Sequence, residues 1–226
     1  MNFLQLVQQV FDESAIQGNS PTALASVSGI NKRLKSWTAE AWRKIQVSRP
    51  NWRWMRASAS AQTVIGQRSY VPATEFALTR FARWAPDTFR CYETAVGVSD
   101  EQHLFYMPYD DFRDLYEFGT VASGRPVYFT IDPQNTIHLG PLPDKVYTVS
   151  ADYFKSYQTL SVDGDVPEMP ADFHMAIVFR ALMRYATFDA APEVYDDAKN
   201  DFDAEIARIE KDQLDPVRTH EVTLVE

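Results

Sequence analysis

The sequence predicts an α+β fold in which helices at both ends form one bundle, an antiparallel β-rich region is inserted between them, and an extended C-terminal arm follows. Helical periodicity occurs near both ends of the chain, strand-like runs lie between, and the last ten residues have β-type residues without helical spacing. Because elements of one type cluster instead of alternating, we do not expect a doubly wound sheet. We expect a single domain, 1–226, composed of an N-terminal helical hairpin (1–56), a β-rich insertion (57–160), a C-terminal helical hairpin (170–214) and the arm (215–226).

Two apolar stripes predict the N-terminal hairpin. The first predicts a short amphipathic helix over 2–13 and consists of Phe3, Leu6, Val7, Val10 and Phe11. The second predicts a longer helix over roughly 23–48 and consists of Ile30, Leu34, Trp37, Ala41 and Ile45. Arg49-Pro50 ends this second helix, because the residue before a proline disfavours the α conformation.

Short β-rich runs bounded by Gly and Pro predict the strands of the insertion, at 63–65, 69–71, 89–93, 105–106 and 147–157. The clearest signal is a hairpin of 127–131 and 136–139, joined by Asp132-Pro133-Gln134-Asn135. Between these runs, 110–118 is typical of a short helix, with Asp110 or Asp111 as its N-cap and Gly119 after its end.

The C-terminal hairpin breaks at Asp189-Ala190-Ala191-Pro192, because proline fits the first turn of a new helix better than the middle of an old one. The helix after it carries one apolar stripe and many acids. The helix before it, 173–188, is apolar nearly all round, which requires cover on more than one side. Its polar strip is Arg180, Arg184 and Thr187, and we expect these residues at a contact between subunits.

The arm begins after Asp215-Pro216, where proline stops the last helix. The residues assigned to the arm are Val217, Thr219, Val222, Leu224 and Val225. Ten residues with this content can add to the edge of a sheet or lie in a partner's groove, or they can form a frayed terminus.

Composition and motifs point away from catalysis. The sequence has no Gly-rich phosphate loop and no G-x-S-x-G elbow. Its histidines, His103, His138, His174 and His220, lack metal-ligand spacing, and we expect His174 to cap or flank its helix. Cys91 lies in a predicted strand, which favours a buried core residue over a nucleophile. We therefore expect no catalytic residues, no cofactor and no metal.

Acid pairs occur at Asp110-Asp111, Asp196-Asp197 and Asp163-x-Asp165. A carboxylate pair that flanks a cleft can hydrolyse glycosides, which leaves a cell-wall hydrolase as one alternative. Solvated helix faces explain the second pair better, and a turn explains the third.

The charges are unevenly distributed along the chain. Residues 1–90 carry 12 Lys+Arg and 5 Asp+Glu, whereas 91–226 carry 10 and 26. The basic part includes an aromatic segment with Trp42, Trp52 and Trp54, which predicts a nucleic-acid-binding module, a protein interface or a hydrophobic core with a solvated face. No apolar run approaches the roughly 20 residues needed to cross a bilayer, so no membrane partner is expected.

Three motifs resemble the head-to-tail adaptor (connector) proteins of tailed bacteriophages. The first is PADFHMAIVFRALMRYATFDAAPEVY, followed by an acidic helix that ends near residue 214. The other two are SRPNWRWM at 48–55 and VDGDVPEMP at 162–170. They occur in the order found in that family and span nearly the whole chain.

The resemblance implies a structural virion protein of the head–tail neck that is assembled in the cytoplasm of the bacterial host. Such a protein would form a ring, typically dodecameric, beneath the portal protein and offer a platform to a tail or nozzle protein. Genomic DNA would pass through its channel without sequence-specific binding. The resemblance also implies that the arm docks on the portal or an adjacent subunit, and we expect the acidic half to line the channel.

Overall fold

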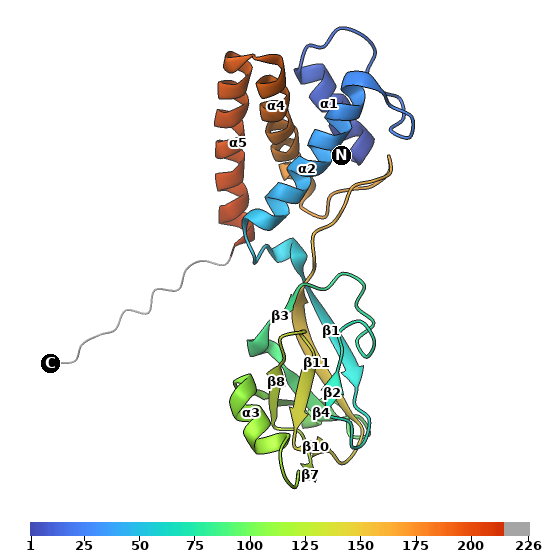
Figure 1. The fold of residues 1–226 in the computed structure, drawn as a ribbon, viewed down its shortest axis with the longest axis vertical. Helices are drawn as coiled ribbons and strands as arrows, with labels where there is room; N and C mark the ends of the chain where they lie inside the picture. The colour runs from blue at the N-terminus through green and yellow to red at the C-terminus, as the bar shows by residue number, and fades with distance from the viewer. Residues whose placement is uncertain (215–226) are drawn as a thin grey trace, which may run out of the picture. The chain divides into compact units, whose positions relative to one another are not determined.

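The computed structural model describes residues 1–214 (Figure 1). The chain divides into two compact units. The first, called the helical unit here, comprises Met1–Trp54 and residues 157–214, and the second, called the β unit, comprises Met55–Ser156. The expected extended arm, 215–226, lies outside the described residues.

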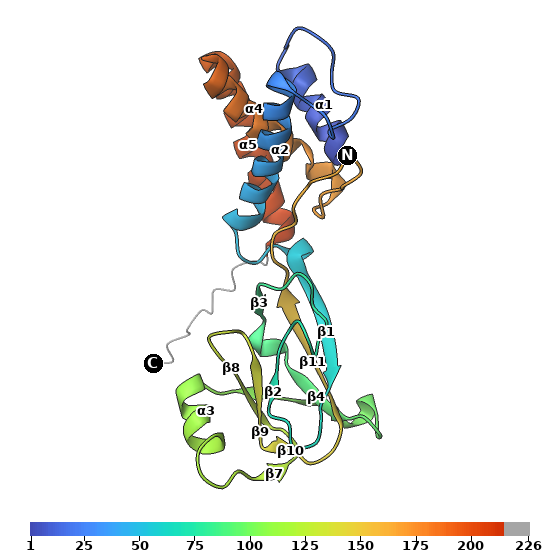
Figure 2. The same cartoon turned by 45° about the vertical axis from the view of Figure 1, so that its right-hand side comes forward.

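Four helices build the helical unit: α1 (Phe3–Glu13), α2 (Gly29–Ser48), α4 (Met175–Asp189) and α5 (Pro192–Gln213). Helix α4 packs against α5, α2 and α1, and α1 also packs against α2. Figures 1 and 2 show the two hairpins side by side in both views. The predicted bundle of terminal helices is therefore confirmed.

Helix α1 follows the predicted stripe, since all five of its apolar residues are buried. Its start is fixed by a capping box in which the Asn2 side chain accepts from the amide of Gln5, and the Gln5 side chain accepts from the amide of Asn2, both at 2.9 Å.

Helix α2 begins later than the predicted residue 23. Gly29 has φ +56°, a left-handed conformation that no helix arriving from 23–28 could pass through. The preceding segment is held elsewhere, because the amide of Leu24 donates to Oδ1 of Asp163 at 3.0 Å and Leu24 itself is buried. Residues 23–28 serve as a connection rather than as the first turns of the helix.

The break between α4 and α5 lies where it was predicted. Ala190 adopts the left-handed conformation with φ +53°, and Pro192 occupies the first turn of α5. The apolar surface of α4 finds its cover within the same chain, on α1, α2 and α5. The buried residues of α4 are Ala176, Ile177, Val178, Ala181, Leu182, Tyr185 and Ala186.

The β unit contains two main sheets and a short pair. One sheet has the order β1-β11-β4-β5, with β3 also paired to β11, and the other has the order β2-β9-β8-β6. Their strands are β1 (Arg56–Gln62), β2 (Ser69–Tyr70), β3 (Arg83–Trp84), β4 (Arg90–Glu93), β5 (Gln102–His103), β6 (Phe105–Tyr106), β8 (Tyr128–Ile131), β9 (Ile137–Gly140) and β11 (Tyr147–Phe154). The short pair is β7 (Ser123–Gly124) with β10 (Leu142–Pro143).

Pairing is antiparallel except in β6–β8 and β7–β10. The predicted hairpin is confirmed as β8–β9, where Asn135 has φ +66° and Oδ1 of Asp132 accepts from the amides of Gln134 and Thr136. The core between the sheets includes Trp84, Phe89, Cys91, Phe129, Leu139 and Val149. Together the units confirm the α+β class.

The structure corrects two local predictions in the β unit. The first strand is Arg56–Gln62, not 63–65, and it pairs with β11 over its full length. Val64 and Ile65 are 57% and 62% exposed, next to Gly66 with φ +77°. Helix α3 (Tyr109–Tyr116) follows Pro108, and neither Asp110 nor Asp111 caps it, although both lie in the first turn, where the helix dipole favours acids.

The uneven charge along the sequence does not separate the two units. Residues 1–54 and 157–214 carry 12 Lys+Arg and 16 Asp+Glu, and residues 55–156 carry 9 and 12. The basic helix α2 packs in the same bundle as the acidic helix α5.

Candidate functional site

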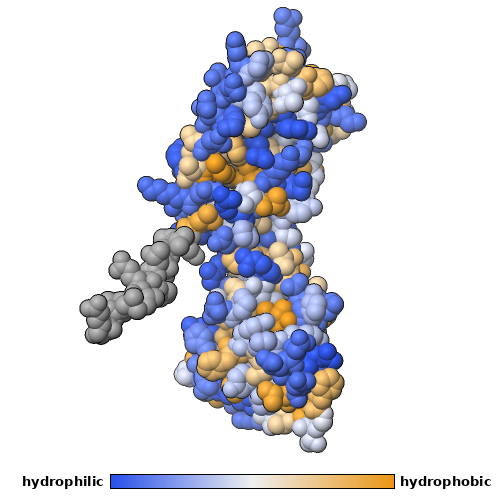
Figure 3. All heavy atoms as spheres, turned by 60° about the vertical axis from the view of Figure 1, so that its left-hand side comes forward, coloured by the Kyte–Doolittle hydropathy of each residue, from blue (hydrophilic) through white to orange (hydrophobic). Residues whose placement is uncertain are grey.

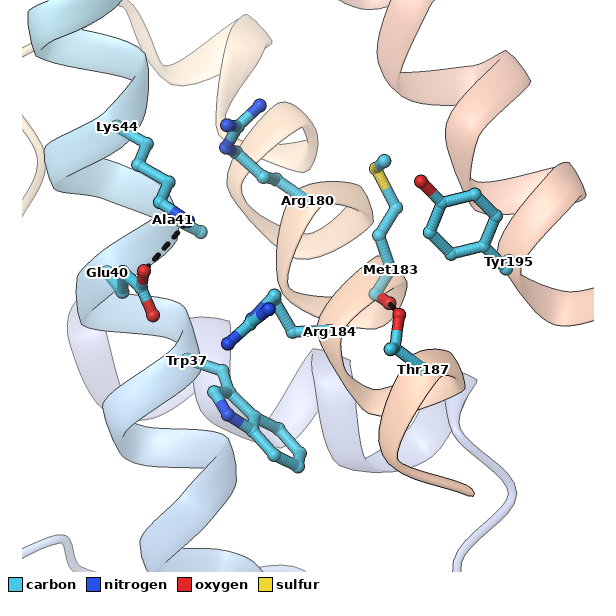
Figure 4. Close-up of a pocket in the computed structure, with 9 residues that line it drawn as sticks. All are labelled: Trp37, Glu40, Ala41, Lys44, Arg180, Met183, Arg184, Thr187 and Tyr195. Carbon is cyan, nitrogen blue, oxygen red and sulfur yellow. Dashed lines mark hydrogen bonds and ion pairs between the residues drawn. The ribbon is translucent and has the colours of Figure 1, made fainter. Parts of the chain in front are cut away.

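A cavity of about 150 Å³ opens between α2, α4 and α5 of the helical unit (Figure 4). The three predicted interface residues, Arg180, Arg184 and Thr187, all line it. They are joined by Trp37, Glu40, Ala41 and Lys44 from α2, Met183 from α4 and Tyr195 from α5. The narrow polar strip of α4 is therefore the floor of a concave site.

Arg180 is partly buried in this cavity. Its Nε atom is buried and has no hydrogen-bond partner among the described residues, and its Cζ atom lies 5.0 Å from the centre of the Phe202 ring. Burial lowers the pKa of Arg180, while Glu40 acts in the opposite direction. A guanidinium stays charged in proteins, so this group is a cation that lacks a hydrogen-bonded anion.

Arg184 is the more exposed of the two, and it makes no hydrogen bond or ion pair with any residue in 1–214. Glu40 is the single carboxylate lining the cavity, and its Oε1 atom lies 2.8 Å from Nζ of Lys44. The hydrogen bond from Lys44 lowers the pKa of Glu40, and the positive charges of Arg184 and Arg43 lower it further. The cavity therefore holds three cations, Arg180, Arg184 and Lys44, but only one carboxylate, Glu40, which is already paired with Lys44.

The side chains of α4 divide between the two walls. Figure 4 shows Arg180 and Arg184 on the side of α4 that faces α2, with Met183 and Tyr195 on the side toward α5. Thr187 donates its hydroxyl to the carbonyl of Met183 at 2.8 Å, so its hydrogen atom is used within its own helix. The polar opening is therefore dominated by positive charge and can hold an anion through charge-assisted hydrogen bonds.

The aromatic segment lies inside the helical unit. Trp42 and Trp52 are 0% exposed, and Trp54 stacks on Trp52 with ring centroids 4.5 Å apart. The Trp42 indole donates to Oε1 of Gln158, and the Trp52 indole donates to the carbonyl of Ile45. Trp42 and Trp52 are packed in the core and cannot stack on nucleic-acid bases, and Trp54 is half-buried with one face already stacked on Trp52.

Basic side chains of the same segment are engaged by the acidic helix. Nη2 of Arg49 lies 2.7 Å from Oε1 of Glu210, and Nη1 of Arg53 donates to the carbonyl of Asp212. The nucleic-acid-binding alternative therefore loses its stacking platform and part of its free charge.

The predicted arm residues, Val217, Thr219, Val222, Leu224 and Val225, lie outside the described residues.

The histidines and the cysteine are placed in structural surroundings. His174 is the N-cap residue of α4, as expected, but its side chain makes no capping hydrogen bond: the ring is buried, with Nδ1 2.7 Å from the Met1 amine and Nε2 3.2 Å from the Met169 carbonyl. Burial, followed by the positive amine, lowers the pKa of His174. Cys91 is buried in β4, which raises the pKa of its thiol to about 11.

One cluster was not predicted. His138 lies between two carboxylates, with Nδ1 3.4 Å from Glu117 and Nε2 3.4 Å from Asp132, because α3 and the β8–β9 turn bring distant residues together. Nδ1 also lies 3.3 Å from Oγ of Ser69. Within 1–214, no group of three or more His, Cys, Asp or Glu residues has the arrangement to hold a metal ion.

The acid pairs do not form a common site. The Asp165 carboxylate accepts from the amides of Ser161 and Val162, which lowers the pKa of Asp165 and makes this motif a turn, as predicted. Asp196 and Asp197 lie exposed on α5, and Asp110 and Asp111 lie exposed on α3.

Among the described helices, none combines the length and apolar character needed to span a bilayer.

Comparison with known proteins supplies the family. The sequence model of the SU10 adaptor protein matches residues 1–222, which is nearly the whole chain. No curated protein matches the sequence. The chain therefore belongs to the SU10 adaptor protein family, whose members are structural phage proteins of the head–tail adaptor type.

Proposed function

We propose that the protein forms a ring beneath the portal in the head–tail neck, extends the DNA channel, and gives a tail or nozzle protein its docking platform. The family match over residues 1–222 is the observation that carries this proposal. It includes both helical hairpins and the β unit, so the whole described architecture is that of a family member.

The ring, taken as dodecameric, requires head-to-tail contacts that close on themselves. We place Arg180, Arg184 and Thr187 at this contact. The support is chemical, since the cavity presents two guanidinium groups for which the described chain provides no hydrogen-bonded anion. Groups of this kind are satisfied when a second protein surface supplies carboxylates.

The channel is proposed to pass genomic DNA without sequence-specific binding, and its wall is assigned mainly to residues from 91–226. Exposed acids such as Asp110, Asp111 and Asp114 on α3 support this assignment, because negative walls repel phosphate and keep DNA mobile. The arm, 217–225, is assigned to the portal or to an adjacent subunit.

The test is to mix the purified protein with isolated portal rings and to record native mass spectra and cryo-micrographs. We expect a closed ring, most simply of twelve copies, bound to one side of the portal. A chain that stays monomeric and unbound in the presence of the portal would contradict the proposal. Weak DNA affinity with a shallow salt dependence is expected in parallel, since few phosphates would be neutralised.

A further inference from the structure

We infer that the cavity receives acidic side chains from α5 of a neighbouring copy, so that the first half of α5 in one subunit closes the cavity of the next. This inference rests on the proposed ring and names the partner of its subunit contact. The acids concerned form a row along α5: Glu193, Asp197 and Asp201.

The row has the geometry of a continuous ridge. Its members are four residues apart, so their side chains lie one above another on the helix surface. All three are exposed, and none makes a hydrogen bond or ion pair within residues 1–214. The helix dipole favours Glu193 in the first turn of α5, but like charges at this spacing weaken an isolated helix, so Asp197 and Asp201 have no evident stabilising role in the single chain.

The rest of the first half of α5 does not neutralise the row. Lys199 is the one basic residue between positions 192 and 203, and its Nζ atom lies 2.7 Å from Oδ2 of Asp203. Figure 3 brings the side of α5 forward and shows hydrophilic side chains over much of it. The row is therefore an anionic surface, and no basic side chain of the first half of α5 is available to pair with it.

A subunit cannot use its own row to fill its own cavity. Helix α5 turns Tyr195 toward the cavity and buries Ala198 and Phe202 against the bundle. At 100° per residue, Glu193 and Asp197 lie about 160° around the helix from Tyr195, and Asp201 lies about 120° from it. The cavity and the row are thus two different surfaces of one chain, which is the arrangement that a head-to-tail ring contact requires.

The cavity suits a carboxylate in size and charge. Its volume of about 150 Å³ is well above the ~10–15 Å³ that a single water molecule needs, which leaves room for one or two side-chain ends. Arg180 and Arg184 offer planar donor groups that match a carboxylate in a bidentate manner. A second copy is favoured over DNA because the surrounding unit carries more acids than bases, which repels a polyanion.

Charge reversal on each side, and on both sides together, tests the contact in the full chain assembled on portal rings. The variants are Arg184→Glu, the triple change Glu193→Lys with Asp197→Lys and Asp201→Lys, and their combination. Each separate change should raise the protein concentration at half-assembly at least about ten-fold, and the combination should recover most of this loss. A triple reversal of Asp12, Glu13 and Asp87, which are exposed acids outside both the contact and the assigned channel wall, is the charge-matched control and should assemble normally.

The outcomes separate this inference from the proposed function. If the unaltered protein forms no ring on the portal, the proposed function fails. If the unaltered protein forms rings and both charge-reversed variants assemble as well as it does, the proposed ring is supported and the contact named here is wrong. Loss of DNA affinity in Arg184→Glu with normal assembly would also overturn it, by making the cavity a phosphate site. Arg184→Gln, which removes charge without adding any, covers the case in which the glutamate variant misfolds, and it should weaken assembly in the same direction.

Discussion

Replacing Trp52 by alanine should remove a large part of the stability of the helical unit. The side chain is 0% exposed, its ring stacks on Trp54 at 4.5 Å with an interplanar angle of 16°, and its indole donates to the Ile45 carbonyl at 2.9 Å. This residue therefore joins the end of α2 to the segment that leads into the β unit.

The magnitude follows from these contacts. Truncation of a buried Trp to Ala costs about 3–5 kcal/mol in free energy of unfolding. Within that, the hydrogen bond contributes about 0.5–1.5 kcal/mol and the aromatic pair a similar amount. Trp52→Phe keeps a ring but loses the indole donor, while the Ile45 carbonyl still accepts from the Ser48 hydroxyl at 2.7 Å, so we expect a smaller loss of about 1–2 kcal/mol.

Urea unfolding followed by far-ultraviolet circular dichroism measures the effect without relying on tryptophan emission. With a slope of about 2 kcal/mol per molar urea, a loss of about 4 kcal/mol lowers the midpoint of the helical transition by about 2 M. Tyr157→Ala is the control, since Tyr157 is 47% exposed and its loss should stay within about 0.5 kcal/mol. If Trp52→Ala unfolds at the same midpoint as this control, Trp52 is not a core residue, and the segment is again available to a partner or to DNA.

Three further outcomes are expected. Gly140→Ala would place a Cβ atom 2.8 Å from the Tyr116 ring and should cost about 1–3 kcal/mol, whereas Gly164→Ala meets nothing within 4 Å and should be close to neutral; thermal melts that rank them otherwise would contradict the packing of α3. The lowered pKa of His174 means that the unfolded chain takes up the proton more readily. Its contribution to stability is therefore present above about pH 6.5 and is lost as the pH falls from there toward the folded-state value. Urea midpoints at pH 7.5 and 5.5 should show a smaller drop for His174→Gln than for the unaltered chain, and an equal drop would refute this. Deletion after Pro216 should leave the thermal transition unchanged yet prevent attachment to portal-bearing heads, and a truncated chain that attaches normally would remove the arm from the contact.

Apolar periodicity was sufficient to predict that α1, α2 and α5 exist, because each buries a stripe that the sequence displays directly, but it did not show that α2 starts only at Gly29. Strand β1 escaped prediction for the opposite reason: Arg-Ala-Ser-Ala-Ser-Ala-Gln has small residues of low β propensity, and its strand conformation depends on the full-length pairing with β11. Pairing of that kind is a tertiary effect, which a local window cannot contain.

The residues of the candidate site likewise fall into two groups, those that can be predicted from one segment and those that only tertiary packing brings together. The strip of Arg180 and Arg184 is visible at helical spacing within one segment. Its counterpart on α2, the Glu40–Lys44 pair, lies about 140 residues away in the sequence and is brought near only by bundle packing. The surroundings of His138 were missed for the same reason, since Glu117 reaches it through the packing of α3 on the sheet.

The chain enters and leaves the β unit through two neighbouring strands. Its first strand begins at Arg56 and its last strand ends at Phe154, and these two residues are direct antiparallel partners. Paired residues of this kind have Cα atoms about 5 Å apart, so a linker of roughly two to five residues could replace the whole insert and keep the helical chain continuous. This arrangement would let the insert be exchanged as a module at two adjacent points of the chain, without interrupting any helix of the bundle.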